Sequence, residues 1–251
     1  MDSTTTASSI AQHIGDLGMS YYFDKGTSAA GKEIGLDVVS FYFIGRGGVL
    51  GDVPANEVDD TFYFFKKGAV EGMYSHARSL IDAATGAAAH LDAANEFARR
   101  TFGAVPGSVV AEFTEAAALV VGAAPAGNWP IFDGYRGYER PSDALADAYR
   151  QCILLRELRG GVHTDAVKAS GLSVAESCYL DHDGAYFALH GFSDDDKPEV
   201  TDELRQRRLD AEADTTRRMA ELLGVLSDAQ RDALVAGASA LHAALASPVA
   251  Q

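Results

Sequence analysis

Alanine-rich segments with helical periodicity constrain the fold of this 251-residue chain more than any other feature of its sequence. They cover roughly residues 68–82, 86–102 and 107–122, and glycine or proline residues separate them. Apolar residues that recur every three or four positions are typical of amphipathic helices, and glycine and proline mark the turns between helices. Because strand-like alternation is scarce, the sequence predicts a mainly α fold that begins with an N-terminal helical array.

Residues that begin and end helices extend this prediction to the rest of the chain. Ser142 can cap a strong helix that Gly160 and Gly161 stop, and the stretch DHDGAYFALHGF (residues 181–192) has the alternation and glycines of a small β-hairpin. Further helices are predicted from Thr27 or Ser28 to Gly35, from Pro54 onward, and at 162–169, 173–180, 199–223 and 228–246. Helix, short helix, turn, short helix, hairpin and long helix is the order of a winged helix-turn-helix unit.

Composition shifts suggest where the chain divides. The stretch APAGNWPIFDGYRGYERP combines three prolines, three glycines, two tyrosines and the chain's only tryptophan, which is typical of a long ordered loop. We therefore predict a disordered tail at residues 1–9, an N-terminal helical domain at 10–125, a connecting loop at 126–140 and a winged-helix-like domain at 141–251.

The net charge of the chain limits which classes of partner it can bind. The chain has 21 basic and 36 acidic residues, a net charge of -15, and such a surface repels phosphate backbones and anionic membranes. Its two cysteines, Cys152 and Cys178, offer neither a disulfide framework nor a zinc site. The N-terminus lacks the features of a signal peptide, and no stretch approaches ~18 uninterrupted apolar residues. We expect a soluble, cytoplasmic protein that does not bind a membrane, and the charge argues against binding to nucleic acid.

Two passages carry a resemblance to a known family. FYFIGRGGVLGDVPANEVDDTFYFF and LLRELRGGVHTDAVKASGL, together with the tail DELRQRRLDAEADTTRRMAELLGVLSDAQRDAL, resemble a family of actinobacterial proteins described as SalK-like or helix-turn-helix proteins. The resemblance covers most of residues 20–245. The C-terminal half is similar in layout to MarR-type regulators, whose final helices dimerise, so the resemblance implies a homodimer. It implies a fold more than a function.

The glycine-rich stretch FYFIGRGGVLGD invites comparison with nucleotide-binding loops. A dinucleotide fingerprint needs a glycine where this chain has Leu50, and a P-loop needs a Gly-Lys-Ser/Thr sequence that does not follow. Asp52 and the acidic helix after Pro54 would also repel a phosphate. We therefore interpret the four glycines as positions of a sharp turn and of close packing between helices.

Arg46 lies between these glycines, with Tyr42 and Phe43 before it, Val49 and Leu50 after it, and Tyr63 and Phe64 on the next predicted helix. An arginine in such surroundings needs a carboxylate, a ring face or a ligand anion as its partner. The sequence favours a structural ion pair with Glu157 or an aspartate, and a bound anion is the alternative.

The stretch LRELRGGVHTD contains a candidate for chemistry, His163, two residues before Asp165. An oriented imidazole can act as a general base or as a haem or metal ligand, although a lone histidine is more often structural. No HxxxH, HExxH or CxxC motif accompanies it, so no closed metal site is predicted.

The predicted reading helix, SVAESCYL, is poorly suited to DNA. Base edges are read by Arg, Lys, Asn or Gln, and this helix offers only Glu176, with Asp181 and Asp183 just after it. Residues 141–251 contain 11 basic and 19 acidic residues, so this half is itself acidic. The basic clusters at 205–208 and 217–218 alternate with acidic residues, as on a salt-bridged, solvated helix face.

The leading hypothesis is a small-molecule-binding sensor or regulatory accessory protein, with aromatic and arginine side chains that favour an anionic ligand. An enzyme or a cofactor-binding protein, haem-dependent in one form, that uses His163 is the first alternative. A MarR-like DNA-binding regulator is the second. The candidate ligand-binding residues are Tyr42, Arg46, Tyr63, Phe64, Trp129, Arg156, Arg159 and His163.

Overall fold

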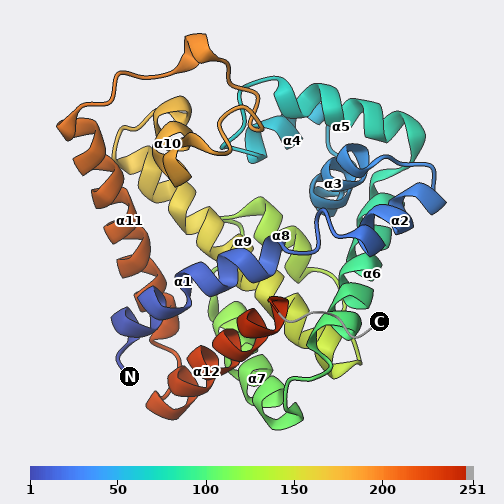
Figure 1. The fold of residues 1–251 in the computed structure, drawn as a ribbon, viewed down its shortest axis with the longest axis vertical. Coiled ribbons are helices and arrows are strands. Elements are labelled where there is room, and N and C mark those ends of the chain that lie inside the picture. Colours follow the sequence, from blue (N-terminus) through green and yellow to red (C-terminus); the bar gives the residue numbers. More distant parts are fainter. Residues whose placement is uncertain (247–251) are drawn as a thin grey trace.

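The computed structural model describes residues 1–246, apart from the side chains of residues 182 and 183, and this part of the chain is almost entirely helical (Figure 1). The α-helices are α1 (Ser3–Met19), α2 (Lys25–Glu33), α3 (Val38–Gly47), α4 (Ala55–Thr61), α5 (Ala69–Leu80), α6 (Ala83–Phe102), α7 (Gly107–Ala123), α8 (Pro130–Arg136), α9 (Ala144–Ala169), α10 (Val174–Leu180), α11 (Asp202–Leu223) and α12 (Asp228–Leu245). Three 3-10 turns accompany them: η1 (Gly48–Leu50), η2 (Asp181–Gly184) and η3 (Asp194–Asp196). The predicted mainly α fold is confirmed.

Side-chain caps explain where many of these helices begin. The carboxylate of Asp37 accepts hydrogen bonds from the backbone amides of Val39 and Ser40 at the start of α3. Ser173 and Ser227 each form a reciprocal capping box at the starts of α10 and α12. The predicted caps of these last two helices are therefore confirmed.

The long helix α9 lies in the middle of the molecule and packs against α1, α6, α7 and α11 (Figure 1). The N-terminal helix α1 lies among C-terminal helices, since it packs against α9, α11 and α12. The main hydrophobic core accordingly draws buried side chains from α1, α6, α7, α9 and α12. Any residue of α9 that faces α1 or α6 is thus in the interior.

Three predictions about local structure are wrong. Residues 3–9 belong to α1 and form no tail, because this helix buries Thr6, Ala7 and Ile10. The segment 126–140 is not all loop but contains α8. The long helix does not stop at Gly160 and Gly161, nor does a separate helix begin at residue 162, because α9 continues to Ala169. A Cβ atom at residue 161 would lie 2.4 Å from the ring of Trp129, so this glycine serves packing.

The predicted β-hairpin at residues 181–192 is also wrong, and residues 1–246 contain no strand. The segment starts with η2 and continues through turns, with Gly184 and Gly191 at positive φ. The rings of Phe187 and Phe192 stack with their centres 4.8 Å apart. The carbonyl oxygen of His190 accepts a hydrogen bond from the backbone amide of Lys66, which is not part of a strand. Two glycine turns and the stacking of Phe187 on Phe192 thus shape the segment where the hairpin was predicted. The last five residues of the predicted C-terminal domain, 247–251, lie outside the described residues.

Candidate functional site

A buried group of ionic and aromatic side chains, which we call the Arg46 cluster, consists of Tyr22, Tyr42, Arg46, Arg156 and Glu157. The Nη2 atom of Arg46 lies 2.8 Å from Oε2 of Glu157, and its Nη1 atom donates to the Tyr42 hydroxyl at 2.8 Å. The Nη1 atom of Arg156 donates to Oε1 of Glu157 at 2.6 Å, and the Tyr22 hydroxyl donates to the same oxygen at 3.3 Å. The ion pair that the sequence favours for Arg46 is confirmed, with Glu157 as its carboxylate.

Aromatic rings enclose the charges of this cluster. The guanidinium carbon of Arg46 lies 4.9 Å from the ring centre of Phe62 and 5.6 Å from that of Tyr22. The guanidinium carbon of Arg156 lies 5.5 Å from the centre of the same Tyr22 ring. Both cations therefore lie close to Tyr22, and the quadrupole of its ring favours both charges.

Burial and charge act in opposite directions on Glu157. Burial alone would raise the pKa of its carboxyl, but the two guanidinium groups hold this pKa below its ordinary value. Two permanent cations then face one anion, so the Arg46 cluster carries a surplus of one positive charge. The side chain of Arg156 is 26% exposed, whereas those of Arg46 and Glu157 are 9% and 6% exposed, so Arg156 connects the cluster to the surface.

Glycines allow the helices around the cluster to approach closely. A Cβ atom at residue 45 would lie 2.2 Å from the ring of His90, and one at residue 18 would lie 2.6 Å from Cβ of Arg156. Residues 38–47 form a helix and not a phosphate-binding loop, and Gly51 takes a positive φ at the turn that follows η1. The interpretation of these glycines as packing and turn positions is therefore confirmed.

A second ionic group lies between α9 and α11, and we call it the Glu212 cluster: Arg159, His163, Arg208, Glu212 and Thr215. Arg159 contacts the Glu212 carboxylate directly, and Nη1 of Arg208 lies 3.2 Å from Oε2 of Glu212. The Nδ1 atom of His163 lies 2.9 Å from the Thr215 hydroxyl and 3.7 Å from the same carboxylate. The side chain of Glu212 is 38% exposed, so this cluster borders solvent.

The hydrogen bonds of Thr215 fix the tautomer of His163. The Thr215 hydroxyl donates to the carbonyl oxygen of Ala211 at 2.7 Å, so it can only accept from His163, whose Nδ1 therefore carries the proton. Burial first, and Arg208 next, lower the pKa of His163 to about 4, which makes the ring neutral at pH 7. Its Nε2 then has a free lone pair. The described residues contain no group of three or more side chains placed to hold a metal ion.

The structure places the remaining candidates along the two sides of α9. The ring of Phe64 stacks on that of His163 with centres 5.6 Å apart, and Lys168 lies over the ring of Tyr63. The indole Nε1 of Trp129 donates to Asp165 at 3.0 Å. The eight candidates thus do not line one pocket: Tyr42, Arg46 and Arg156 lie in the Arg46 cluster, Arg159, His163 and Phe64 lie in or beside the Glu212 cluster, and Tyr63 and Trp129 contact other residues of α9.

Sequence reasoning missed several buried polar residues around the Arg46 cluster. The Tyr21 hydroxyl lies 3.1 Å from Nδ1 of His90, while Tyr135 and Arg150 each have buried polar atoms without a hydrogen-bond partner. The adjacent tyrosines at positions 21 and 22 were the one sequence feature that could have indicated these contacts, because neighbouring side chains at the end of a helix face different parts of the structure. Nothing in the sequence pattern marks the others.

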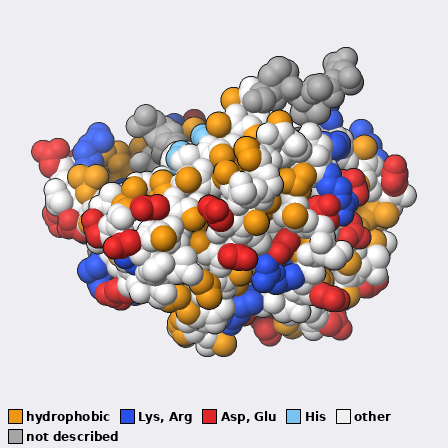
Figure 2. Space-filling view, turned by 90° about the horizontal axis from the view of Figure 1, so that it is seen from below, with side chains coloured by type: hydrophobic (Ala, Val, Ile, Leu, Met, Phe, Trp, Pro, Cys, Tyr) orange, Lys and Arg blue, Asp and Glu red, His pale blue; other side chains and the backbone are white. Residues whose placement is uncertain are grey.

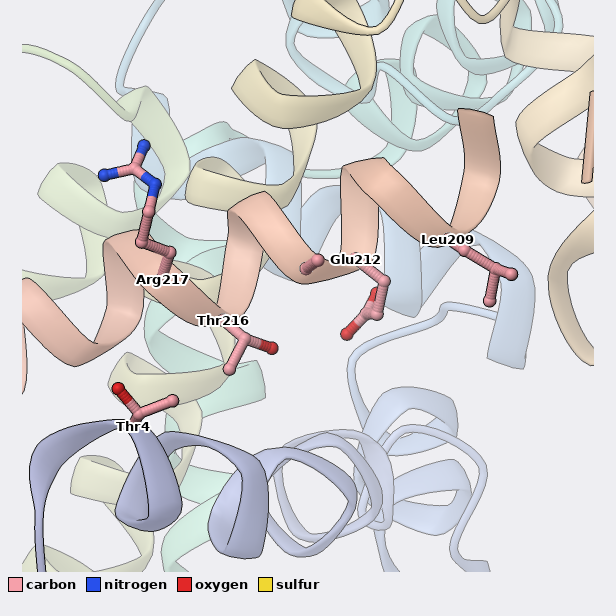
Figure 3. Close-up of a pocket in the computed structure, with 6 residues that line it drawn as sticks. Thr4, Leu209, Glu212, Thr216 and Arg217 are labelled. Atoms are coloured by element: carbon pink, nitrogen blue, oxygen red, sulfur yellow. The ribbon is translucent and has the colours of Figure 1, made fainter. Parts of the chain in front are cut away.

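A groove of about 390 Å³ runs between α1 and α11, and Figure 3 shows Thr4 facing Thr216 across it. Its lining includes Glu212 and Arg217, whose charges are already neutralised by neighbours on α9 and α11. The remaining lining is largely apolar, with Leu209 at its edge. The groove therefore offers shape but no unpaired charge.

The helices α9 and α10 follow each other in the order of a helix-turn-helix. A short turn with Gly171 at φ 72° separates them, and Ser173 and Glu176 cap the second helix reciprocally. The side chain of Glu176 is engaged in this cap, and α10 contains no basic residue. On the face shown in Figure 2, acidic and basic side chains are interspersed and form no continuous basic surface.

Comparison with known proteins gives one match. The model of a family described as a helix-turn-helix family matches residues 7–190, which include both α9 and α10. No curated protein and no solved structure matches the chain. Within residues 1–246, no helix combines the length and the apolar character that crossing a bilayer requires.

Proposed function

The chain belongs to the helix-turn-helix family, and on this premise we propose that it is a sensor or regulatory accessory protein that binds a small anionic molecule at the Arg46 cluster. The observation that carries this proposal is the surplus positive charge of the Arg46 cluster inside a strongly acidic protein, because Arg156 and Glu157 of this cluster lie on α9, the first helix of the helix-turn-helix pair. An anion placed beside Arg156 would neutralise this surplus in a site that excludes much of the solvent.

A contiguous path connects this cluster to α10. Phe62, whose ring lies against Arg46, is followed two residues later by Phe64. Phe64 stacks on His163 of α9, and its carbonyl oxygen accepts a hydrogen bond from the thiol of Cys178 in α10 at 3.1 Å. A ligand that shifts Arg46 or Phe62 would therefore change the packing of both helices of the pair. We assign the remaining candidates, Tyr63, Trp129 and Arg159, to this path, because they lie on or beside the same part of α9.

Thermal unfolding with benzoate as the probe tests the ligand site, because benzoate combines a carboxylate with an aromatic ring. If the dissociation constant is ~1 mM, 10 mM benzoate should raise the melting temperature of the wild type by about 3–5 °C. Arg156→Gln removes the surplus charge but leaves the Arg46–Glu157 pair intact, and it should abolish the shift. Arg217→Gln on the exposed face of α11 is the matched control and should retain it. Equal shifts in all three proteins would contradict the proposal.

Direct DNA reading is not part of this proposal, because α10 offers no side chain suited to base edges. A mobility-shift assay with the DNA upstream of the protein's own gene should show no complex at ~50 mM salt, where phosphate contacts are strongest. A specific shift under these conditions would favour the MarR-like regulator instead.

A second candidate function rests on the free lone pair of His163 Nε2. A neutral imidazole whose other nitrogen is held by a hydrogen bond is the usual state of a cofactor ligand or a general base. Titration of the protein with haem should give a saturable Soret shift that His163→Ala abolishes. Absence of any such shift would remove the haem form of this candidate.

The resemblance to SalK-like proteins and to MarR-type regulators implies a homodimer that forms through the last two helices. The exposed side chains of Leu209 on α11 and Val225 after it support this part of the proposal. Light scattering coupled to gel filtration should give twice the chain mass of 26.5 kDa, and a monomer at ~50 µM would contradict it.

A further inference from the structure

A hollow of about 530 Å³ lies between α5 and the turn that joins η1 to α4. Residues 52–55 of the turn and of the start of α4 line it, together with Tyr74, Ser75, Arg78 and Ser79 of α5. Small-molecule sites have volumes of roughly 300–1,000 Å³, so the hollow can hold a ligand of that kind. It shares no lining residue with the Arg46 cluster and is therefore a separate site.

Two opposite charges lie side by side in this lining. The Nη2 atom of Arg78 donates to Oδ1 of the exposed Asp52 carboxylate at 2.6 Å. Within residues 1–246 this is the one hydrogen bond that either side chain forms, so Nε and Nη1 of Arg78 and Oδ2 of Asp52 keep their capacity to bind a ligand. An ion pair at the surface contributes little to stability, which leaves both groups open to a further partner.

The hydroxyl of Tyr74 adds a third polar group. Tyr74 lines the hollow although it is fully buried, and its hydroxyl oxygen has no hydrogen-bond partner. A Cβ atom at residue 47 would lie 2.7 Å from the ring of Tyr74, so close packing against α3 holds this ring in place. Burial raises the pKa of Tyr74, so the hydroxyl keeps its proton and can donate it to a bound oxygen atom. A ligand that accepts this hydrogen bond would satisfy a group that is costly to leave unpaired.

The paired charges decide which ligand fits the hollow. An anion attracted by Arg78 would also meet the carboxylate of Asp52, and a cation attracted by Asp52 would also meet Arg78. A zwitterion whose ammonium and carboxylate groups are joined through one carbon atom can face both charges at once. Val53 and Pro54 give the same hollow an apolar part, on which an aliphatic side chain can pack.

We propose that this hollow binds an α-amino acid with an apolar side chain. The carboxylate of the amino acid accepts hydrogen bonds from Arg78 and from the Tyr74 hydroxyl, and its ammonium group donates to Asp52. Its side chain packs on Val53 and Pro54. This site goes beyond the function proposed above and does not rest on it.

Melting temperatures with L-leucine test the site, against two analogues that each lack one of its charges. Isocaproate has no ammonium group, and isoamylamine has no carboxylate. If the dissociation constant is ~1 mM, ~10 mM leucine should raise the melting temperature of the wild type by about 3–5 °C, and each analogue should raise it by less than ~1 °C. A shift with either analogue as large as that with leucine would overturn the inference. So would the absence of a saturable shift with leucine up to ~50 mM.

Two substitutions remove the charges one at a time. Arg78→Gln and Asp52→Asn should each abolish the leucine shift, and because the ion pair is at the surface both variants should melt within ~2 °C of the wild type without leucine. Arg99→Gln, which removes the surface ion pair with Glu96 on α6, is the matched control and should retain the shift. An undiminished shift in Arg78→Gln or in Asp52→Asn contradicts the inference.

Two further variants separate this site from its surroundings. Tyr74→Phe keeps the packed ring but removes the hydroxyl, and it should reduce the leucine shift by half or more. Arg156→Gln alters the Arg46 cluster and should retain the leucine shift even where it abolishes the benzoate shift. The inference and the function proposed for the Arg46 cluster therefore fail separately.

Discussion

The Arg46 and Glu212 clusters each place two arginines on one glutamate, but Arg208 of the second cluster also pairs with Asp181 at 3.2 Å, and the two clusters differ strongly in burial. The side chain of Glu157 is 6% exposed and that of Glu212 is 38% exposed. Around Glu157, rings of tyrosine and phenylalanine replace water, so each charge depends on its protein partners. Around Glu212, solvent screens the same interactions. The number of ion pairs in a cluster therefore says little about its contribution to stability. That contribution depends on how deeply the shared carboxylate is buried.

The largest effect is expected from Glu157→Gln. This change leaves two guanidinium groups without a carboxylate in the interior and should lower the free energy of unfolding by about 3–5 kcal/mol. Chemical denaturation of the wild type and the variant measures it. A loss below ~1 kcal/mol, or a loss that 0.5 M salt removes, would place the Arg46 cluster in the same class as the exposed one.

A smaller effect is expected from the buried histidine of the Glu212 cluster. The pKa of His163 is about 4 in the folded protein and near ~6.5 when unfolded, so the folded state binds fewer protons between these values. Stability is then fully present above pH ~6.5 and declines as the pH falls toward 4. His163→Gln removes this titration, so the stability of the wild type relative to the variant should fall by on the order of 2 kcal/mol between pH 7 and pH 4.5. A relative stability independent of pH would mean that His163 is not desolvated.

The smallest effect is expected from Glu212→Gln, the counterpart of the Glu157 substitution. Since solvent can replace the lost carboxylate, the free energy of unfolding should fall by no more than ~1 kcal/mol at low salt and by less at 0.5 M salt. Denaturation at the two salt concentrations checks this. A loss as large as that of Glu157→Gln would end the distinction between the two clusters.

Local sequence signals located most of the helices because caps act within one turn, although α9 is capped by Asp143 and not by Ser142, and α2 by Asp24 and not by Thr27 or Ser28. Ser173 and Ser227 mark the starts of α10 and α12 from hydrogen bonds to residues three positions later. The errors have a different origin, since they depend on partners far along the chain. Gly160 and Gly161 would end a helix in isolation, but the ring of Trp129 packs against Gly161 and the helix continues. The alternation of apolar and polar residues at 181–192 suggests a strand, but residues 1–246 contain no strand with which this segment could pair.

Only part of the candidate site could be predicted from the sequence, because its residues also depend on partners far along the chain. Arginine among aromatic residues must have a partner, so a carboxylate for Arg46 could be expected, and Glu157 lies 111 positions away. Arg150 could not be identified in this way. It lies in the stretch AYRQCILLRELR, where the sequence pattern does not distinguish it from Arg156 or Arg159, and only the packing of neighbouring helices against α9 shows that it is buried.

Amide hydrogen exchange of α9 and α10, with and without benzoate, tests most directly whether the Arg46 cluster is a ligand site coupled to the helix-turn-helix pair. The account predicts that saturating benzoate slows exchange in residues 156–169 and 174–180 of the wild type, because Phe64 links the cluster to both helices. The same experiment on Arg156→Gln should show no change. Unchanged exchange in α10 of the wild type, or equal protection in the variant, would contradict it.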